Sequence, residues 1–432
     1  MKKYLAYLLT TALLSALLLS GCGQSAVVAE SDDSSFIGSI TLLNIKSEVG
    51  DQINALATQY QKETGITVNV INVAAGVDAQ ATIKGYYLSD QMPDIIACET
   101  AGFDNWEGLL ADMSSEEWAS RTESAFTNSY GTIGFPYTTE AIGLAYNSDI
   151  LEKCGIDPSS ITGPEAMKSA FETIDEKKDQ LGLKAVVGYC AEPENLGWSS
   201  GNHIFGAYLD SGLSRSDTTY IDLLNNGGTL DTDRFTNYAE MIGLFIQYSD
   251  PDLVLDGTYD EQVLGFAKGE YAFVTQGSWI GAVLTGNDAE AYASAGNFSV
   301  GMVPYAFEDG MDTILTSAPS WWAVPKEGNV EQAKAFLQWC SEDSAQQILV
   351  ESAGFISPFT DCKYVASDPF AQVISEYISA GKTSSWHWMD MPENLGQKGF
   401  AYAFQKFAAG EVDAAGFMKE IQQIAAEWYA KL

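Results

Sequence analysis

The segment from residue 39 to residue 73 most constrains the fold, because it carries the patterns of a strand, a helix and a second strand. "ITLLNI" is a short apolar run, "GDQINALATQYQKETG" repeats apolar side chains at helical spacing up to Gly65, and "ITVNVINV" alternates between apolar and polar residues. A strand, helix and strand in this order form a right-handed crossover that makes the two strands parallel. The chain is therefore predicted to be α/β.

The same pattern recurs along the chain. "MPDIIACE" predicts a third strand ending at Glu99, "LKAVVGYC" predicts a buried strand after a helix over residues 163–182, and residues 231–248 predict a helix that starts at an aspartate. Strands are also predicted in "FSVGMVPY" and "WWAVP", and helices dominate from Asn329 onward. Because one hydrophobic core stops growing near about 250–300 residues, a chain of 432 residues predicts at least two lobes.

The first 21 residues have the layout of a secretory signal. Lys2 and Lys3 give a positive start, residues 4–20 carry no charge, and the small residues Ser20 and Gly21 stand where a signal peptidase cleaves. A membrane-spanning helix is the alternative, since about 20 apolar residues cross a bilayer. No charged stop-transfer cluster follows, which favours the signal and predicts that the protein works outside the cytoplasm.

The charge of the chain limits its ligands. There are 22 basic and 58 acidic residues, with a formal net charge of −36. A surface this acidic repels phosphate backbones and anionic lipid headgroups, so no nucleic acid and no polybasic membrane binding are expected. A neutral or cationic ligand fits better than an anionic one. With two histidines in the chain, a metal site built from imidazoles is not expected.

Five cysteines lie beyond Cys22, at positions 98, 154, 190, 340 and 362. Their spacing contains no Cys-x-x-Cys and no dense disulfide framework. Most are therefore predicted to be buried as small apolar residues. One bridge, between Cys340 and Cys362, is the alternative left open.

The quartet Leu19-Ser20-Gly21-Cys22 resembles the lipobox of bacterial lipoproteins. The resemblance implies that residues 1–21 are a lipoprotein signal peptide and that Cys22 is lipidated as the first residue of the mature chain. Several acyl chains would anchor it firmly, since each buried CH₂ contributes about 0.8 kcal/mol. Residues 22–37 are then expected to be a flexible polar tether that lifts the folded part off the membrane.

Several separated stretches resemble the extracytoplasmic solute-binding proteins of bacterial ABC transporters, in the carbohydrate-binding branch that includes maltose-binding protein. They are "MPDII", "FPYTTEAIGLAYNSDIL", "FAKGEYAFVTQGSW" and "WWAVPKEGNVEQAKAFLQWC", in the family's order. The resemblance implies a two-lobed, periplasmic-binding-protein-like (Venus flytrap) fold with a hinge and a ligand cleft between the lobes. Closure about such a hinge is a known kind of conformational switch.

The resemblance also implies boundaries and partners. The N-terminal lobe is expected to comprise residues 38–141 plus 304–328, and the C-terminal lobe residues 142–303 plus 329–432. The protein is expected to be a monomeric receptor, with no cofactor and no catalytic activity. It would capture a mono- or oligosaccharide at the outer face of the bacterial cytoplasmic membrane and deliver it to the permease subunits of an ABC transporter.

Tryptophans are the candidate stacking platforms. The C–H face of a sugar ring packs flat on an aromatic ring, and the hydroxyls at its edge need acceptors such as carboxylates and amides. Trp279 follows an apolar strand and matches the family's Gly-x-Trp, so it is expected to line the cleft, with burial in the core as the alternative. Trp321 and Trp322 alternate sides in an extended segment, and Trp321 is expected to face the ligand. Trp198 and Trp388 lie in loops assigned to the cleft, although Trp388 could instead pack as core.

Acidic and amide residues are the candidate hydrogen-bond partners. Glu140 matches the family's acidic residue before the Tyr-Asn helix start. Glu48 follows the first strand, at a cleft-facing position, although a helix-start carboxylate stabilised by the helix dipole is the alternative. Glu99 ends the third strand. Asn202 and His203 share the loop "NLGWSSGNHIF", and His203 either binds the ligand or has a structural role.

Two other functions stay open. The same fold could bind another small solute, such as a peptide, an amine or a metal chelate, and an acid-lined aromatic cleft could hold a quaternary amine by cation–π attraction. A glycoside-active enzyme needs two carboxylates about 5–10 Å apart across a sugar ring, and no motif singles out such a pair. The composition of the cleft decides between a sugar and an amine, and an anion receptor would need arginines there.

Overall fold

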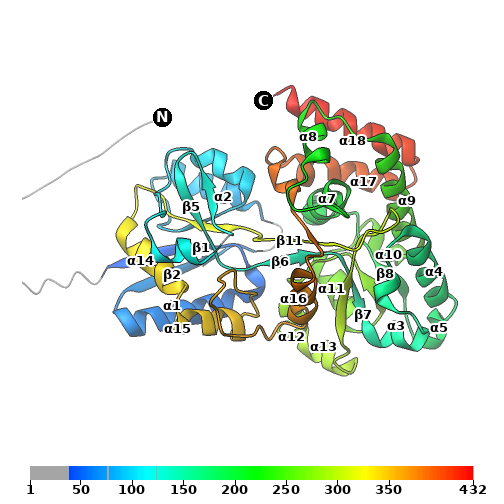
Figure 1. Cartoon of the computed structure of the whole chain (residues 1–432), viewed down its shortest axis with the longest axis horizontal. Helices are drawn as coiled ribbons and strands as arrows, with labels where there is room; N and C mark the ends of the chain where they lie inside the picture. Colours follow the sequence, from blue (N-terminus) through cyan, green and yellow to red (C-terminus); the bar gives the residue numbers. More distant parts are fainter. Residues whose placement is uncertain (1–37, 75–76, 123, 432) are drawn as a thin grey trace, which may run out of the picture. The chain divides into compact units, whose positions relative to one another are not determined.

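The computed structural model describes residues 38–74, 77–122 and 124–431 (Figure 1). The predicted signal peptide, Cys22 and the tether lie outside these residues. Within them, no helix combines the length and the apolar character needed to cross a membrane.

The first lobe contains a sheet in the order β2-β1-β3-β12-β5-β4, in which a parallel bridge between Leu42 and Ile95 joins β1 to the strands beyond it. Its strands are β1 (Ser39–Asn44), β2 (Thr67–Asn72), β3 (Ile96–Cys98), β4 (Phe126–Asn128), β5 (Gly131–Pro136) and β12 (Trp321–Ala323). β1 and β2 are parallel and are connected by α1 (Gly50–Thr64), which confirms the predicted crossover unit. β12 pairs antiparallel with both β3 and β5, so a strand from the last third of the chain completes this sheet.

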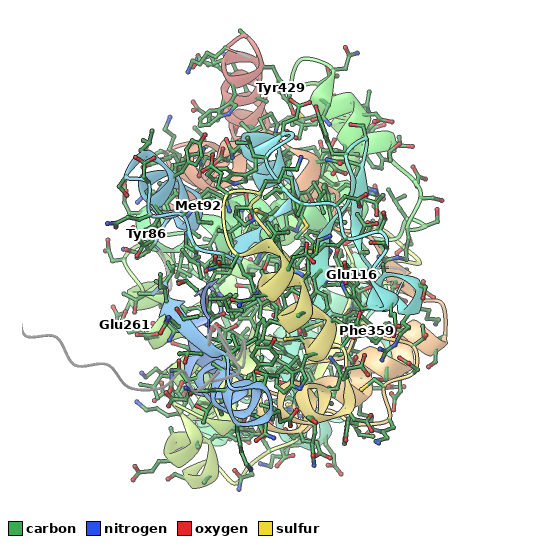
Figure 2. The ribbon with its side chains drawn as sticks, turned by 90° about the vertical axis from the view of Figure 1, so that its left-hand side faces the viewer. Tyr86, Met92, Glu116, Glu261, Phe359 and Tyr429 are labelled. Carbon is green, nitrogen blue, oxygen red and sulfur yellow. The ribbon has the colours of Figure 1, made fainter. Side chains whose placement is uncertain are left out.

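Helices from late in the chain cover the first lobe. The ring of Phe336 in α14 (Val330–Cys340) lies 5.0 Å from the ring of Tyr60 in α1, and α15 (Asp343–Gln347) also contacts α1. Phe359, labelled in Figure 2, belongs to the same core. The prediction that residues 329–432 all belong to the C-terminal lobe is therefore wrong for residues 330–359, because the apolar face of α14 packs on the core beside α1.

The second lobe contains the sheet β10-β7-β9-β8, in which β8 and β9 are parallel. Its strands are β7 (Leu144–Asn147), β8 (Ala185–Gly188), β9 (Tyr271–Val274) and β10 (Val300–Val303). Two predicted helices, α4 (Pro164–Asp175) and α9 (Thr232–Tyr248), pack on β8. The C-terminal helices α17 (Ala401–Ala408) and α18 (Ala414–Tyr429) pack on each other, and α18 also packs on α9.

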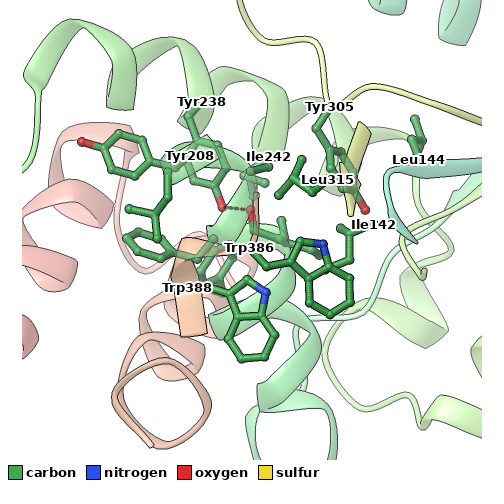
Figure 3. Packing of buried hydrophobic residues seen from close by; sticks show 14 of the residues in the cluster. Ile142, Leu144, Tyr208, Tyr238, Ile242, Tyr305, Leu315, Trp386 and Trp388 are labelled. Atoms are coloured by element: carbon green, nitrogen blue, oxygen red, sulfur yellow. Dashed lines mark hydrogen bonds between the residues drawn. The ribbon is translucent and has the colours of Figure 1, made fainter. Parts of the chain in front are cut away.

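Aromatic side chains fill the core of the second lobe (Figure 3). The hydroxyl of Tyr238 donates to the carbonyl of Ile204 at 3.0 Å, shown as a dashed line in Figure 3. The ring of Phe307 lies 5.6 Å from that of Tyr238, and the ring of Tyr305 lies 5.9 Å from that of Phe245. Residues 305–307, predicted for the N-terminal lobe, therefore pack in the second lobe, because their aromatic rings complete this core.

The chain passes between the lobes through a small linking sheet. β6 (Glu140–Ile142) pairs antiparallel with β11 (Ile314–Ser317), and β13 (Thr383–Ser384) pairs with β11. Figure 1 shows β6 and β11 running between the two groups of elements. The chain crosses again between Phe355, which is buried in the first core, and Phe370, which packs with the second lobe.

The remaining helices surround these sheets. They are α2 (Ala79–Leu88), α3 (Ser148–Cys154), α5 (Lys178–Leu181), α6 (Pro193–Trp198), α7 (Phe205–Asp210), α8 (Thr219–Asn225), α10 (Pro251–Val254), α11 (Tyr259–Ala267), α12 (Ile280–Thr285), α13 (Ala289–Ser294) and α16 (Ala371–Ser379). Among the described residues every cysteine is free, and Cys98, Cys154, Cys190 and Cys340 are buried as predicted. The alternative of a bridge between Cys340 and Cys362 is wrong.

Two glycines allow a matched test of the first lobe. Gly65 ends α1 with φ of 81°, and a Cβ there would meet no neighbouring atom, so Gly65→Ala changes only the backbone energy. We expect this substitution to lower the free energy of unfolding in urea by about 1 kcal/mol, because a left-handed alanine is strained. Gly85 lies inside α2 with equally open space, so Gly85→Ala should raise the free energy of unfolding by roughly 0.5–1 kcal/mol. Equal effects at the two sites would contradict this account of the helix end.

Candidate functional site

A cavity of about 650 Å³ is lined by residues of both lobes. The first lobe contributes residues 45–48 after β1, the start of α2 and the residue that follows β3. The second lobe contributes the end of α6, the start of α11, the loop that leads into α12 and much of the segment 386–397. A volume of this size lies within the range of about 300–1,000 Å³ that is usual for small-molecule sites.

One wall of the cavity is aromatic. Four tryptophans, which we call the tryptophan cage, surround the ring of His203: Trp198, Trp279, Trp386 and Trp388. Their ring centroids lie 5.2, 4.8, 5.9 and 5.0 Å from the imidazole, in that order. Figure 3 shows the rings of Trp386 and Trp388 beside each other at the edge of the second core. Trp198 and Trp279 are half-buried, so their faces are open to a ligand.

The tryptophan cage keeps His203 neutral. Burial, together with the positive charge of Lys46, lowers the pKa of His203 to about 3. Its Nδ1 atom is buried and has no hydrogen-bond partner among the described residues. The indole nitrogens of Trp386 and Trp388 are likewise buried and unpartnered within the described chain, whereas that of Trp279 donates to Gln276 at 3.1 Å. The cage is therefore held mainly by apolar and ring contacts.

The polar wall of the cavity centres on a buried ion pair. The ammonium of Lys46 lies 2.5 Å from a carboxylate oxygen of Glu140 and 3.7 Å from one of Glu48. Burial opposes the charge on Lys46, but the two carboxylates outweigh it and raise the pKa of the ammonium. Burial raises the pKa of Glu140, against the attraction of Lys46. The side chain of Asn44 holds this turn in place, because its amide nitrogen donates to the carbonyl of Lys46 and its amide oxygen accepts from the N–H of Lys46.

Two further ion pairs join the lobes at the edge of the cavity. Lys84 of α2 lies 3.0 Å from Glu393 of the second lobe, and Lys398 of the second lobe pairs with Asp78, which caps α2. Asn105 of the first lobe also donates to Glu393 at 3.0 Å. Each lobe thus gives one cation and one carboxylate, and both carboxylates line the cavity.

Glu99 also lines the cavity, within the electrostatic reach of Asp78 and Glu393. Its neighbour Thr100 contacts Met389 sulfur at 3.5 Å, so the end of β3 meets the segment that carries Trp388. Glu99 is open to the cavity but enclosed by protein, and burial raises its pKa to about 7. Lys46 opposes this increase, and the negative charges of Asp78 and Glu393 reinforce it.

The structure brings most of the predicted site residues together. All of them except Trp321 line the cavity, namely Glu48, Glu99, Glu140, Trp198, Asn202, His203, Trp279 and Trp388. Whether each touches a ligand stays a prediction. Glu48 lies in the first turn of a short 3₁₀ helix (Ser47–Val49) that leads into α1, so the alternative of a helix-start carboxylate also stays open.

The prediction that Trp321 faces the ligand is wrong. Trp321 is 7% exposed and lies outside the cavity, and its indole nitrogen donates to the carbonyl of Ser124 at 2.6 Å. Trp322 is also buried, with its ring 4.6 Å from that of Tyr137. The alternation of sides does hold, but β12 is a central strand with side chains packed on both faces, so neither tryptophan reaches the cleft.

Several lining residues were not predicted. Lys46 stands two residues before Glu48, but a lysine carries no motif that marks it as the counter-ion of Glu140. Trp386 lies on the cavity beside Trp388, because a turn of 3₁₀ helix at residues 387–390 replaces the extended conformation between them. Between these two, His387 points elsewhere: its Nδ1 lies 2.5 Å from the carboxylate of Asp210.

Residues 197–201 read Gly-Trp-Ser-Ser-Gly, the spacing of a nucleophile elbow. An elbow requires a sharp turn from a strand into a helix. Here the segment runs inside continuous helical structure from α6 into residues 199–204, and Ser199 is 3% exposed and accepts a hydrogen bond from Gln276. The local structure therefore does not present Ser199 as a nucleophile.

Comparison with known proteins gives consistent matches. A family described as bacterial extracellular solute-binding protein matches residues 55–373. An uncharacterized ABC transporter extracellular-binding protein of Pyrococcus horikoshii is 22% identical over 408 residues, 88% of this chain and 86% of that protein. The sn-glycerol-3-phosphate-binding periplasmic protein UgpB of Agrobacterium fabrum is 21% identical over 263 residues, 58% of this chain and 54% of its own.

The fold is also shared with solved structures. A chitin oligosaccharide binding protein superposes with a TM-score of 0.73 at 18% identity, over 91% of this chain and 99% of that one. The predicted two-lobed α/β fold is therefore confirmed.

The ion pair of Lys46 should matter for stability. Lys46→Met leaves the buried carboxylate of Glu140 without its counter-ion, so we expect the free energy of unfolding at pH 7.5 to fall by about 3–5 kcal/mol. The deficit should shrink as the pH falls, because Glu140 has a raised pKa and can then take up a proton. Urea unfolding at several pH values measures this. The half-exposed Lys84 is the control, and Lys84→Met should cost about 1 kcal/mol or less.

The pKa values of the two histidines should be shifted in opposite directions from the ordinary value. NMR of the imidazole rings should show His203 neutral down to about pH 4, since its pKa is lowered to about 3. His387 should titrate above the ordinary value of about 6.5, because its hydrogen bond to Asp210 raises its pKa. Since unfolded His203 takes up a proton first, its contribution to stability is lost as the pH falls from about 6.5 towards 3. His203→Gln assigns the signals, and titration of His203 near pH 6.5 would contradict its burial in the tryptophan cage.

Proposed function

Because the chain belongs to the family of bacterial extracellular solute-binding proteins, we propose that it captures a mono- or oligosaccharide in the cleft cavity for an ABC transporter. The observation that carries this proposal is that the tryptophan cage and a set of carboxylates line the same cavity of about 650 Å³. Sugar rings require such a pair of surfaces, with an aromatic face for the C–H groups and acceptors for the hydroxyls.

Each wall has a distinct role in this proposal. Trp279 and Trp198, which are half-buried, would stack on the sugar rings. Glu99 and Asn202, which line the cavity, would bond to the hydroxyls, with the Glu140 ion pair fixing the polar wall. A ligand that touches both lobes would stabilise the closed state by its differential affinity for it.

The proposal also includes the membrane anchor and the transporter subunits that were predicted from the sequence. Lipidation at Cys22 would anchor a monomeric receptor at the outer face of the cytoplasmic membrane, with residues 22–37 as its tether. The permease subunits of the transporter would accept the sugar from the receptor. The protein would carry out no chemistry on the ligand, in keeping with a family named for solute binding.

A phosphorylated ligand, as bound by the UgpB relative, fits the cavity less well. Lys46 is the basic residue among the described residues that line it, and Glu140 already neutralises Lys46. A phosphate would therefore meet a wall of carboxylates without a free cation. A quaternary amine remains the second candidate, because the tryptophan cage offers indole faces for cation–π contacts.

Trp279→Ala tests the stacking wall. We expect at least about a tenfold loss of sugar affinity, or roughly 1.4 kcal/mol, because the ring face that packs on the sugar is removed. The ligand is first found by tryptophan fluorescence of the chain beginning at Gly23, titrated with mono- and oligosaccharides, glycerol phosphate, amino acids and choline. Calorimetry then gives the affinity of the variant for that ligand.

Trp428→Ala is the matched control, since Trp428 lies in α18 outside the cavity lining. Its affinity should equal that of the unchanged protein. If Trp279→Ala binds the ligand with unaltered affinity, Trp279 does not contribute to the binding site. A response to no sugar in the panel would overturn the proposed function itself.

A further inference from the structure

Acidic residues outnumber basic ones in the lining of the cavity. Its described lining has one basic residue, Lys46, against a set of carboxylates: Glu48, Asp78, Glu99, Glu140, Asp260, Asp288 and Glu393. Hydroxyl groups can be bound by uncharged amides as well as by carboxylates. The excess of carboxylates gives the cavity a net negative charge, which a cationic group on the ligand would reduce.

Some of these carboxylates are already neutralised by the protein. Glu140 pairs with Lys46, Glu393 pairs with Lys84 and Asp78 pairs with Lys398. Glu48 lies 3.7 Å from the same Lys46. The pairs at the edge and on the polar wall thus account for the lysines near the cavity.

Glu99 and two acids of the second lobe remain without a salt bridge within the described residues: Asp260 at the start of α11 and Asp288 before α13. Asp260 raises the pKa of Asp288, after the larger effect of burial. Glu99 faces the negative charges of Asp78 and Glu393, with Lys46 as the opposing cation. An added positive charge beside Glu99 would be attracted by Glu99 and by its negative neighbours Asp78 and Glu393.

The aromatic wall suits a cation as well. The end of β3 that carries Glu99 meets the segment of Trp388, through the contact of Thr100 with Met389. A cation near Glu99 would therefore lie beside indole faces, which attract ammonium groups by cation–π interaction. A protonated primary amine also offers three hydrogen-bond donors, enough to bond Glu99 and further acceptors at once.

We infer that the ligand is an amino sugar, a saccharide whose protonated primary amine lies against Glu99 and the tryptophan cage. This inference rests on the proposed function, because it assumes that the same cavity binds a saccharide. It adds the substrate class: the sugar rings stack on the tryptophans, and the ammonium neutralises the acid that no lysine of the described chain reaches.

Matched pairs of sugars test this class directly. Cellotriose and the chitosan trimer have the same β-1,4 linkage and differ at C2, where a protonated amine replaces a hydroxyl; glucose with glucosamine and galactose with galactosamine add single rings. Calorimetry at pH 7, where Glu99 with its pKa of about 7 is about half ionised, compares each pair on the unchanged protein. EDTA is present to remove bridging divalent cations. We expect the amine to bind at least about tenfold more tightly than its hydroxyl partner, the order expected for a hydrogen bond to a charged group.

Glu99→Gln assigns the effect to its residue. This variant should lose about tenfold in affinity for the amine while its affinity for the hydroxyl sugar changes less than about threefold, because the amide keeps an acceptor oxygen but loses the charge. Glu172→Gln is the control, since it removes the same charge from the exposed surface of α4. Should Glu99→Gln fail to fold, proton release on amine binding near pH 7, measured in buffers of different ionisation enthalpy, provides the same information from the unchanged protein.

The outcomes are distinguishable. Equal or tighter binding of the hydroxyl sugars overturns the amino-sugar inference and leaves the proposed function standing. Binding of choline without any sugar overturns the inference and the sugar proposal together. If no sugar or amino sugar binds, the proposed function is overturned, and the inference with it.

Discussion

The ion pair between Lys46 and Glu140 connects the parts of this molecule on which its cavity depends. Lys46 follows β1 in the first lobe, and Glu140 begins β6, the strand that leaves for the second lobe. Burying two charges costs several kcal/mol per ion unless each finds its partner, so the turn after β1 and the linking strand must meet in one register. Asn44 bonds to the backbone of Lys46 and to Asn72 of β2, which ties the pair to the first sheet.

The two walls of the cavity are stabilised in different ways, and this separates their roles. The polar wall is fixed by the ion pair between Lys46 and Glu140 and by the hydrogen bonds of the Asn44 side chain to the backbone of Lys46. The tryptophan cage packs around an imidazole that burial keeps uncharged, and two of its indole nitrogens have no partner within the described residues. Such a wall, with hydrogen bonds at only some of its indoles, can adjust to an apolar surface more easily than the polar wall, which cannot move without separating charges. Specificity for polar groups is therefore expected from the carboxylates, and tolerance of different ring arrangements from the tryptophans.

Local patterns allowed much of the fold to be predicted. The crossover unit of residues 39–73 was found because its helical and alternating periods, and the glycine that ends its helix, lie within one short segment. The division of later segments between the lobes was partly wrong, because it depends on pairings over long distances in the sequence. The apolar face of α14 is evident from its spacing, but nothing in that spacing says that it packs beside α1. The same reason explains Trp321, which occupies a central strand that was expected to have an open face.

The central position of β12 also affects how the chain acquires its structure. The strands β1 to β5 leave the ribosome first, yet the gap between β3 and β5 is filled only when residues 321–323 arrive. Closing so long a loop delays the pairing and slows folding, as in other topologies dominated by distant contacts. The nascent first lobe therefore remains an open, incomplete sheet through most of synthesis. For a chain predicted to be secreted, we expect that delay to keep the polypeptide unfolded, and so able to cross the membrane, until the translocation machinery has bound it.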